Sequence, residues 1–349
     1  MATTRTVEEE PLTATAEAEA APSPVPTSPW QHRHLLDLDD VSTDEIATVL
    51  HSASAMKAIV QRDVKKVPTL RGRTIVTLFY EASTRTRVSF EAAGKLLSAD
   101  VINLSASGSS AEKGESLLDT VLTLQATAAD LLVIRHGHSG APYFAARNLT
   151  RTTVINAGDG AHAHPTQALL DLFTMQEHLG SLKGRKVLIV GDISHSRVAR
   201  SDLWGLCKVG AIPVLCGPPT LMPWDLLKGR TETPGHPFAS VQVEQDIEEA
   251  MRDADIVMPL RIQKERQDAG LLPSLREYAQ QWQVNDERLS RLAPNALVMH
   301  PGPMNEGVEI SPEVAHGLQS AVETQVTNGL AVRMALLLLM ATPQGGLNG

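Results

Sequence analysis

The fold of this chain is decided by residues 79–91, with the sequence FYEASTRTRVSFE, where an apolar run meets a helical pattern. The run at 74–80 is β-branched and aromatic, which predicts a buried strand. Apolar residues then recur at helical spacing from Val88 to Leu96, and Ser83 falls where a helix N-cap belongs. We therefore expect a strand, a tight turn and a helix N-terminus.

The start of this helix has the composition of an anion site. Free backbone N–H groups and the positive end of the helix dipole converge at such a junction. Ser83, Thr84 and Thr86 add hydroxyl groups at the same place. Arg85 and Arg87 add positive charge. The simplest ligand with matching chemistry is phosphate, and the alternative interpretation is a capped surface helix with two solvated arginines.

Composition narrows the class of protein. The 349 residues are 42% hydrophobic, which favours two domains with ordinary cores and excludes global disorder. The net charge of −9 argues against nucleic acid or an anionic membrane as the main partner. No apolar run reaches the 18 residues that would predict a membrane span. Residues 1–30 lack the basic and apolar parts of a secretory signal and are predicted to be a disordered tail.

Cysteine and histidine usage predicts no metal and a reducing compartment. Cys207 and Cys216 lie among apolar residues, and their spacing does not match a metal site. A single disulfide between them would be too few to form the framework of the fold. His136 and His138 have no carboxylate or cysteine partner at ligand spacing. We therefore expect a cytoplasmic protein with no metal and no organic cofactor.

Strand and helix patterns alternate along most of the chain, which predicts βαβ units and parallel sheets. Strands are expected at 74–80, 100–104, 131–135, 152–156, 186–190, 211–215, 255–260 and 296–300. An N-terminal helix is expected over 40–60, capped by Ser42 or Thr43. The predicted fold class is α/β, with two domains, each a mainly parallel sheet flanked by helices, joined by long helices.

The predicted domains follow the disordered tail. The first domain is expected over 31–164 and the second over 165–321. The final helix, 322–341, is apolar on more than one face and is expected to return to complete the first domain. The glycine-bearing link at 180–184 is a second plausible boundary.

Four further residues are candidates for binding a ligand, one at the end of a parallel strand, two in the HPTQ stretch and one in a loop. Arg135 ends the strand at 131–135, at the carboxyl end where such sheets bind ligands; the alternative is an arginine snorkelling from the strand end. His164 could polarise a carbonyl and Gln167 could recognise an amide, unless His164 is only structural. Lys113 lies in a small, polar loop at 109–116 and could reach an anionic ligand, although most loop lysines are merely solvated.

The second half supplies candidates for carboxylate binding. The VLIVGD sequence at 187–192 begins like a dinucleotide fingerprint, but the next residues lack its second and third glycines. Arg197 lies just inside the following helix and suits a carboxylate. Arg261 and Gln263 lie two residues apart, so they share a face of an extended backbone. The alternative for this last stretch, RIQKER, is a charged surface loop.

Together these motifs resemble the aspartate/ornithine carbamoyltransferase family over residues 33–341. The STRTR sequence is similar to its carbamoyl phosphate loop, and HPTQ at 164–167 to the motif that holds the carbamoyl group. RIQKER and the Lys-Gly-Glu sequence at 113–115 resemble the aspartate branch, in which that lysine loop enters a neighbouring subunit's site, with Ser109 or Ser110 as its serine. The S-M-G and H-C-L-P motifs of the ornithine branch are absent, and HPGP stands at 300–303 instead.

The resemblance implies transfer of the carbamoyl group of carbamoyl phosphate to the amine of L-aspartate, in pyrimidine biosynthesis. It implies that carbamoyl phosphate is bound by Ser83, Thr84, Arg85, Thr86, Arg135, His164, Gln167, Gly302 and Pro303. The residues implied to be catalytic are Arg85, Thr86, Arg135 and His164. Those implied to bind L-aspartate are Lys113, Arg197, Arg261 and Gln263.

The resemblance also implies a homotrimer with shared active sites and leaves larger assemblies with regulatory or pathway subunits open. One departure is Glu306, where the family would have an arginine. A reversed charge near an aspartate site would weaken binding if it faced inward. Two rival interpretations are a carbamoyltransferase with another amine acceptor and a non-catalytic homologue that binds phosphate metabolites or acts as an assembly partner.

Overall fold

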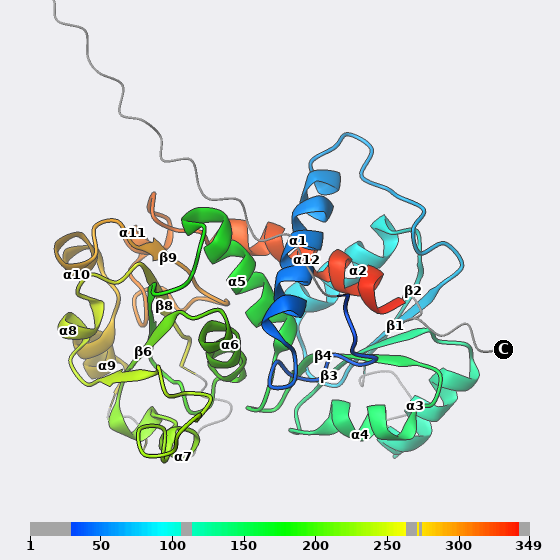
Figure 1. The fold of residues 1–349 in the computed structure, drawn as a ribbon, viewed down its shortest axis with the longest axis horizontal. Coiled ribbons are helices and arrows are strands. Elements are labelled where there is room, and N and C mark those ends of the chain that lie inside the picture. The colour runs from blue at the N-terminus through cyan, green and yellow to red at the C-terminus, as the bar shows by residue number, and fades with distance from the viewer. Residues whose placement is uncertain (1–28, 106–113, 263–270, 272–273, 342–349) are drawn as a thin grey trace, which may run out of the picture.

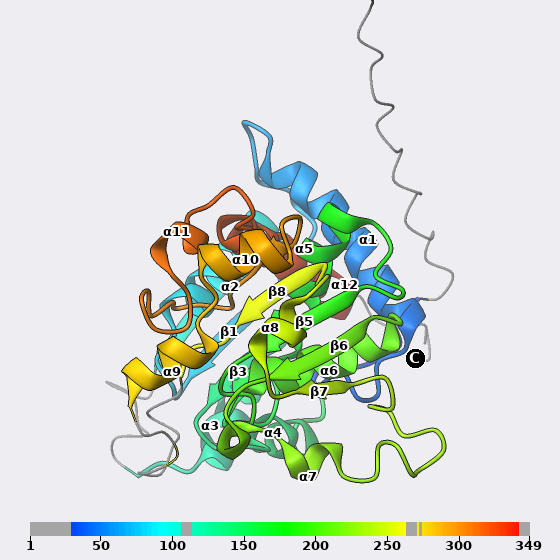
Figure 2. The ribbon, with the colours of Figure 1, turned by 90° about the vertical axis from the view of Figure 1, so that its left-hand side faces the viewer.

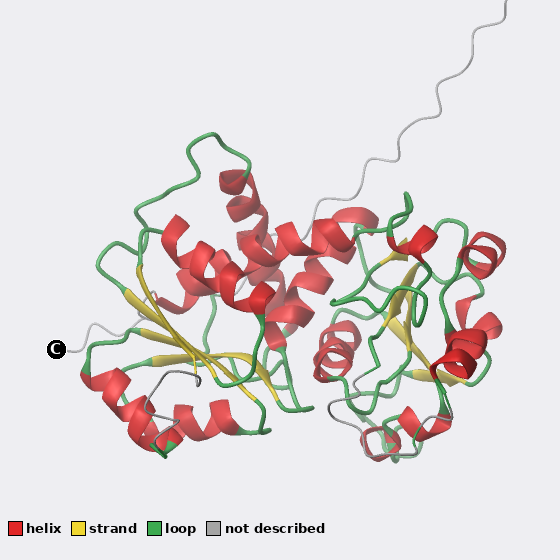
Figure 3. Cartoon of the chain, turned by 180° about the vertical axis from the view of Figure 1, so that it is seen from behind, coloured by secondary structure: helices red, strands yellow, loops and turns green. Residues whose placement is uncertain are grey.

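The computed structural model describes residues 29–105, 114–262, 271 and 274–341. The chain forms two α/β halves, each built on a parallel sheet with helices on its faces (Figure 1). Seen from behind, long helices lie between the two sheets (Figure 3). The predicted fold class is confirmed.

The first half contains a four-stranded sheet with the order β2-β1-β3-β4, in which all pairs are parallel. Its strands are β1 (Thr74–Phe79), β2 (Asp100–Ser105), β3 (Leu131–His136) and β4 (Thr153–Asp159). Its helices are α1 (Thr43–Val60), α2 (Thr84–Leu96), α3 (Leu117–Ala126), α4 (Ala141–Asn148) and α5 (Pro165–Leu179). Helix α1 begins with a capping box in which Ser42 and Glu45 bond each other's backbone N–H groups, so the N-cap is Ser42.

The second half contains a five-stranded parallel sheet with the order β7-β6-β5-β8-β9, most of which faces the viewer in Figure 2. Its strands are β5 (Lys186–Val190), β6 (Ile212–Cys216), β7 (Gln242–Glu244), β8 (Ile256–Pro259) and β9 (Leu297–Val298). Its helices are α6 (Arg197–Lys208), η2 (Pro219–Leu221), α7 (Trp224–Leu227), α8 (Ile247–Met251), α9 (Leu275–Trp282), α10 (Asp286–Leu292) and α11 (Pro312–Ala315).

All eight predicted strands are present, with three differences in detail. Strand β4 runs on to Asp159, beyond the predicted end at 156, because the β3–β4 pairing resumes at Asp159 after an irregularity in register. Strand β9 is only two residues long, and just beyond it the His300 N–H bonds the Gln325 side chain at 2.9 Å. Strand β7 was not predicted, because three residues at a sheet edge with polar ends carry no clear periodic signal.

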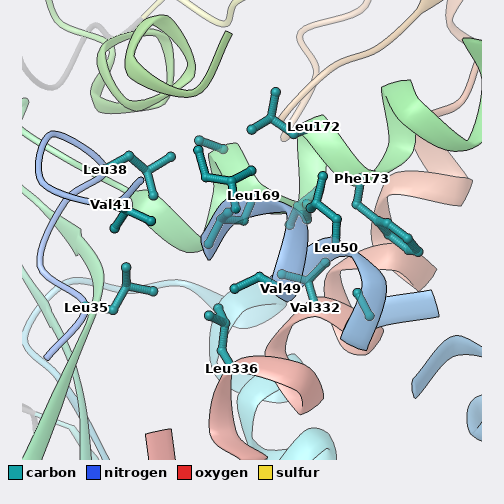
Figure 4. Packing of buried hydrophobic residues seen from close by; sticks show 14 of the residues in the cluster. Leu35, Leu38, Val41, Val49, Leu50, Leu169, Leu172, Phe173, Val332 and Leu336 are labelled. Atoms are coloured by element: carbon teal, nitrogen blue, oxygen red, sulfur yellow. The ribbon is translucent and has the colours of Figure 1, made fainter. Parts of the chain in front are cut away.

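The last helix, α12 (Val322–Ala341), joins the halves. It packs on α1, α2 and α5, and its apolar residues enter one core cluster with both sheets. Figure 4 shows Val332 and Leu336 of α12 beside Val49, Leu169 and Phe173. Helix α12 is apolar and long enough to cross a membrane by composition, but most of its apolar stretch is buried inside the protein. It is a core helix that bonds the middle of α5, and truncating one of its buried leucines would cost about 2–5 kcal/mol.

Candidate active site

The first strand–helix junction, residues 79–87, connects β1 to α2. Ser83 takes the N-cap position with φ −160° and ψ 99°, but its side chain makes no capping hydrogen bond. Thr86 is buried, whereas Thr84 and Arg85 keep much of their surface open to solvent. The N-cap position predicted for Ser83 is confirmed, and its side chain is not used as a cap. The Ser83 hydroxyl and the positive end of α2 are left for a ligand.

A loop from the second half closes against this junction. A Cβ atom placed on Gly302 would lie 2.9 Å from Arg85 Cζ, so the guanidinium group of Arg85 lies directly on the Gly302 backbone. Gly302 has φ +64°, and its N–H donates to His300 Nδ1 at 2.8 Å. The Gly302–Pro303 peptide bond is cis, and Pro303 is exposed. Loop 300–303 thus lies beside the first junction, as the site prediction requires.

Arg261 also lies near Arg85. It follows β8 and is half-buried. Partial burial and, second, the positive charge of Arg261 lower the pKa of Arg85. Two cations from different halves of the chain therefore face the same space, and their repulsion favours a bound anion between them.

A second cationic group lies around Gly158, at the end of β4. A Cβ atom on this glycine would lie 3.0 Å from Arg135 Nη1 and 3.0 Å from Arg197 Cζ. Both arginines donate to Glu81, Arg135 Nη2 to Oε1 at 2.7 Å and Arg197 Nη1 to Oε2 at 3.0 Å. Arg197 Nη1 also donates to the carbonyl of Gly160 at 3.2 Å. Two predicted site residues from different halves are therefore joined by one carboxylate.

Glu81 is a site residue that the sequence analysis missed. It lies inside the decisive 79–91 stretch, two residues after β1. A carboxylate at the carboxyl end of a parallel strand, among four predicted arginines, was the signal that could have identified it. Arg197 does bind a carboxylate, as its position suggested, but in this structure the carboxylate belongs to the chain itself.

His164 and Gln167 lie together at the start of α5. His164 is the N-cap, is buried, and donates its backbone N–H to Ser201 Oγ on α6 at 2.8 Å. Gln167 is nearly buried and donates Nε2 to both carboxylate oxygens of Asp171, at 3.1 and 3.2 Å. Pro165 occupies the first helical position, where proline is favoured.

Three parts of the prediction have other outcomes. Lys113 and Gln263 lie outside the described residues, and so do both candidate loop serines, Ser109 and Ser110. Glu306 is exposed, and its carboxylate lies 3.1 Å from His316 Nε2. The reversed charge at this position is therefore held by a neighbouring histidine on the surface.

The site can bind and polarise a small, highly charged anion. Arg135 and Arg197 share the carboxylate of Glu81, and Arg85 lies beside Gly302 and near Arg261. Donors that are fixed before the ligand arrives stabilise negative charge developing on an oxygen without reorganising. Among the described residues, no group of three or more histidine, cysteine or acidic side chains is arranged to hold a metal ion.

Family models match both halves. Residues 33–177 match the model described as "Aspartate/ornithine carbamoyltransferase, carbamoyl-P binding domain", and residues 183–340 match the "Asp/Orn binding domain" of the same family. The chain is 58% identical over 307 residues to the aspartate carbamoyltransferase catalytic subunit of Roseiflexus castenholzii, covering 88% of this chain and 94% of that one. It is 56% identical over 310 residues to the corresponding subunit of Dehalococcoides mccartyi, covering 89% and 92%.

Solved structures are similar over nearly the same span. Aspartate transcarbamoylase from Trypanosoma cruzi, in complex with carbamoyl phosphate and aspartate, superposes with a TM-score of 0.78 at 32% identity, covering 87% of this chain and 94% of that one. Ornithine carbamoyltransferase from Pyrococcus furiosus superposes with a TM-score of 0.77 at 31% identity, covering 88% and 96%. The fold is thus shared by enzymes that use two different acceptors.

Proposed function

The chain belongs to the aspartate/ornithine carbamoyltransferase family, and from this premise we propose that it carbamoylates L-aspartate. The reaction transfers the carbamoyl group of carbamoyl phosphate to the amine and gives N-carbamoyl-L-aspartate and phosphate. The observation that carries the proposal is that arginines from the two halves meet in pairs. Arg85 and Arg261 face each other at the uncapped end of α2, and Arg135 and Arg197 meet on Glu81, two residues before Ser83. In a chain of net charge −9, such a cluster favours a multiply charged anion.

The first half would hold carbamoyl phosphate. Its phosphate would bind Ser83, Thr84 and Arg85 at the end of α2, where backbone N–H groups and the helix dipole favour an anion. Its carbonyl oxygen would accept from Thr86, Arg135 and His164. These donors would stabilise the charge that the oxygen gains in the tetrahedral transition state.

The second half would orient the acceptor. Arg197, Arg261 and Gln263 would bind the two carboxylates of L-aspartate. The neutral amine then attacks the carbonyl carbon, a C–N bond forms, the bond to the phosphate oxygen breaks, and the departing phosphate takes the amine proton. Holding both reactants in this arrangement supplies an effective molarity of roughly 10⁵–10⁸ M in favourable cases.

The acceptor is the point that an assay must decide, because the similar structures include an ornithine enzyme. The purified chain is incubated with carbamoyl phosphate and either L-aspartate or L-ornithine, and the carbamoylated product is measured. We expect product only with L-aspartate, and we expect succinate to compete with it. Product with L-ornithine alone would favour the other branch, and no product with any amine would favour a non-catalytic homologue.

The assembly we propose is a homotrimer that completes each site with Lys113 of a neighbouring chain, working in cytoplasmic pyrimidine biosynthesis. The support is the resemblance of the Lys-Gly-Glu loop, together with exposed apolar residues around the edge strand β2. Ile102 on β2 and Val88 on the adjacent helix α2 have 48% and 52% of their surface exposed in the single chain. Closed rings are a common way to cover such edges.

A mixing experiment tests the shared site. Lys113→Ala and Arg85→Ala homotrimers should each be nearly inactive, since every site lacks one group. When both are denatured and refolded together, some sites combine an intact Arg85 with an intact Lys113 from the neighbour, so activity should return at up to about a third of the sites of a heterotrimer. Heterotrimers that form but stay inactive would show that Lys113 does not act across subunits.

A further inference from the structure

A fully buried carboxylate lies one helical turn beyond the proposed carbamoyl site. Asp171 on α5 has no exposed surface, and it accepts hydrogen bonds from two side-chain amides. Gln167 Nε2 donates to its two oxygens at 3.1 and 3.2 Å, and Gln325 Nε2 from α12 donates at 2.7 Å. One carboxylate thus ties a predicted substrate-binding residue to the helix that joins the two halves.

The chemistry of this group dictates how both amides are turned. An ionised carboxylate only accepts hydrogen bonds, so each glutamine must direct its NH₂ end toward Asp171 and its carbonyl oxygen away. The Gln325 oxygen accepts from the backbone N–H of His300 at 2.9 Å. Gln167, in the first turn of α5 beside His164, turns its oxygen away from Asp171 in the same way.

Asp171 therefore acts on two parts of the proposed carbamoyl site, loop 300–303 and the start of α5. Through Gln325 it holds the start of loop 300–303, whose Gly302 lies against Arg85. Through Gln167 it acts beside His164 at the start of α5. Burial raises the pKa of Asp171 to about 7, whereas the hydrogen bonds from Gln325 and Gln167 and, last, the positive charge of Arg333 lower it, so the ionised form that this arrangement needs prevails above pH 7.

Building on the proposed function, we propose that Asp171 is a positioning residue that makes the site selective for a carbamoyl group. It fixes the Gln167 oxygen as an acceptor for the carbamoyl NH₂ and, through Gln325, holds loop 300–303 in place. Acetyl phosphate has the same charge and a similar shape but carries a methyl group there. Binding it would leave the Gln167 oxygen facing a methyl group instead of a donor, which costs binding free energy.

The test compares Asp171→Asn with a matched control, Asp202→Asn. Asp202 lies on α6, is equally buried, and has no hydrogen-bond partner for either carboxylate oxygen among the described residues. For each enzyme, the KM for carbamoyl phosphate is compared with the inhibition constants of acetyl phosphate and inorganic phosphate. Asp171→Asn should reduce the preference for carbamoyl over acetyl phosphate by about 10- to 100-fold. It should leave inhibition by inorganic phosphate within about twofold, and Asp202→Asn should keep the wild-type preference.

A double-mutant cycle identifies the path of the effect. Gln167→Met removes the proposed acceptor and should by itself lose the carbamoyl preference. Adding Asp171→Asn to it should then change the preference little, because the choice between carbamoyl and acetyl phosphate acts through the Gln167 contact alone, while the path through Gln325 and loop 300–303 affects both ligands alike. Additive losses, or equal weakening of carbamoyl phosphate, acetyl phosphate and inorganic phosphate, would overturn the proposal.

Two outcomes keep this test separate from the proposed function. If Asp171→Asn does not fold, Gln167→Met decides alone, and a retained preference for carbamoyl phosphate overturns the proposal. A wild-type enzyme that forms no carbamoyl-aspartate would contradict the proposed function itself. An active wild type with an unchanged Asp171→Asn variant would contradict only the role of Asp171.

Discussion

Each half of the molecule contains a parallel strand that leads into a helix with an arginine in its first turn. The two junctions differ in whether the protein itself binds the helix start and the arginine. At the first junction, the Ser83 side chain makes no cap and Arg85 faces the space beside Gly302. At the second junction, residues 190–197, the cap Ser196 accepts from the N–H of Ala199 at 3.1 Å. There Arg197 is buried against Glu81.

The difference shows that geometry alone does not make an anion site. Both helix starts offer a positive dipole end and an arginine. At the second junction the protein supplies its own hydrogen-bond acceptors, so the local charge is already neutralised. At the first junction the cap is missing, and the free energy of binding is available to a ligand.

The largest effect is expected from Arg85→Ala, which removes the cation of the open junction. Turnover should fall by at least about 10²-fold, the scale of losing one preorganised donor. The fold should survive, because Arg85 keeps much of its surface open to solvent. Steady-state kinetics and a thermal unfolding scan measure the two properties.

A matched control lies on the same helix. Lys95, in the last turn of α2, is exposed and pairs only with Glu91 one turn before among the described ion pairs. Lys95→Ala removes the same charge far from the junction and should leave turnover nearly unchanged. Comparable losses in both variants would mean that overall charge, rather than the junction, controls activity.

The second expected effect concerns Glu81, the carboxylate that joins the halves. Glu81→Gln keeps the size of the side chain but removes the charge between Arg135 and Arg197. The two guanidinium groups would then repel each other across Gly158, so we expect turnover to fall by about 10-fold or more and the aspartate KM to rise. A lower aspartate KM would instead show that Glu81 competes with the substrate carboxylate for Arg197.

How much of this site could be predicted from the sequence depends on how far apart along the chain the interacting residues lie. The first junction was predictable, because a strand, a capping residue and a helix are contiguous in residues 79–91. Gly302 against Arg85 was predictable only through the family resemblance, since over 200 residues separate them. Glu81 was missed because its partners Arg135 and Arg197 lie far along the chain, and only the position of Glu81 after a parallel strand pointed to the contact. Asp171 has one partner, Gln167, four residues before it on α5, but the other, Gln325, lies on α12.

The third expected effect comes from the close approach at Gly158. This residue has φ +116°, and a Cβ atom there would meet Arg135 and Arg197 at 3.0 Å. Gly158→Ala should destabilise the fold by about 1–3 kcal/mol through backbone strain and also raise the aspartate KM by displacing Arg197. Gly72→Ala is the control, because it has φ +81° but open space around its Cβ position. If Gly72→Ala changes the KM as much, the arginines are not the cause.

The smallest expected effect tests the cost to folding stability of a buried carboxyl group, which the helix of the second junction has and that of the first does not. Helix α2 buries no charged side chain, whereas α6 buries Asp202 five residues after Arg197. Burial and, second, the negative charge of Asp171 raise the pKa of Asp202, and burial raises that of Asp171 to about 7. A carboxyl group with a raised pKa in the folded state binds its proton more tightly there than when unfolded. Its contribution to stability is therefore complete below the ordinary carboxyl pKa of about 4 and is lost as the pH rises through the folded-state value.

Asp202→Asn removes this pH-dependent cost, because an amide stays neutral at every pH of the experiment. Because the cost begins near the ordinary carboxyl pKa of about 4 and grows as the pH rises toward the folded-state value, the gain in Tm of the variant over the wild type should be small at pH 5. At pH 8 the gain should be larger, about 2–4 °C. Calorimetric scans across this range measure the difference. A Tm shift of the same size at both pH values would mean that packing, not charge, distinguishes the variant, and that the second junction carries no electrostatic cost.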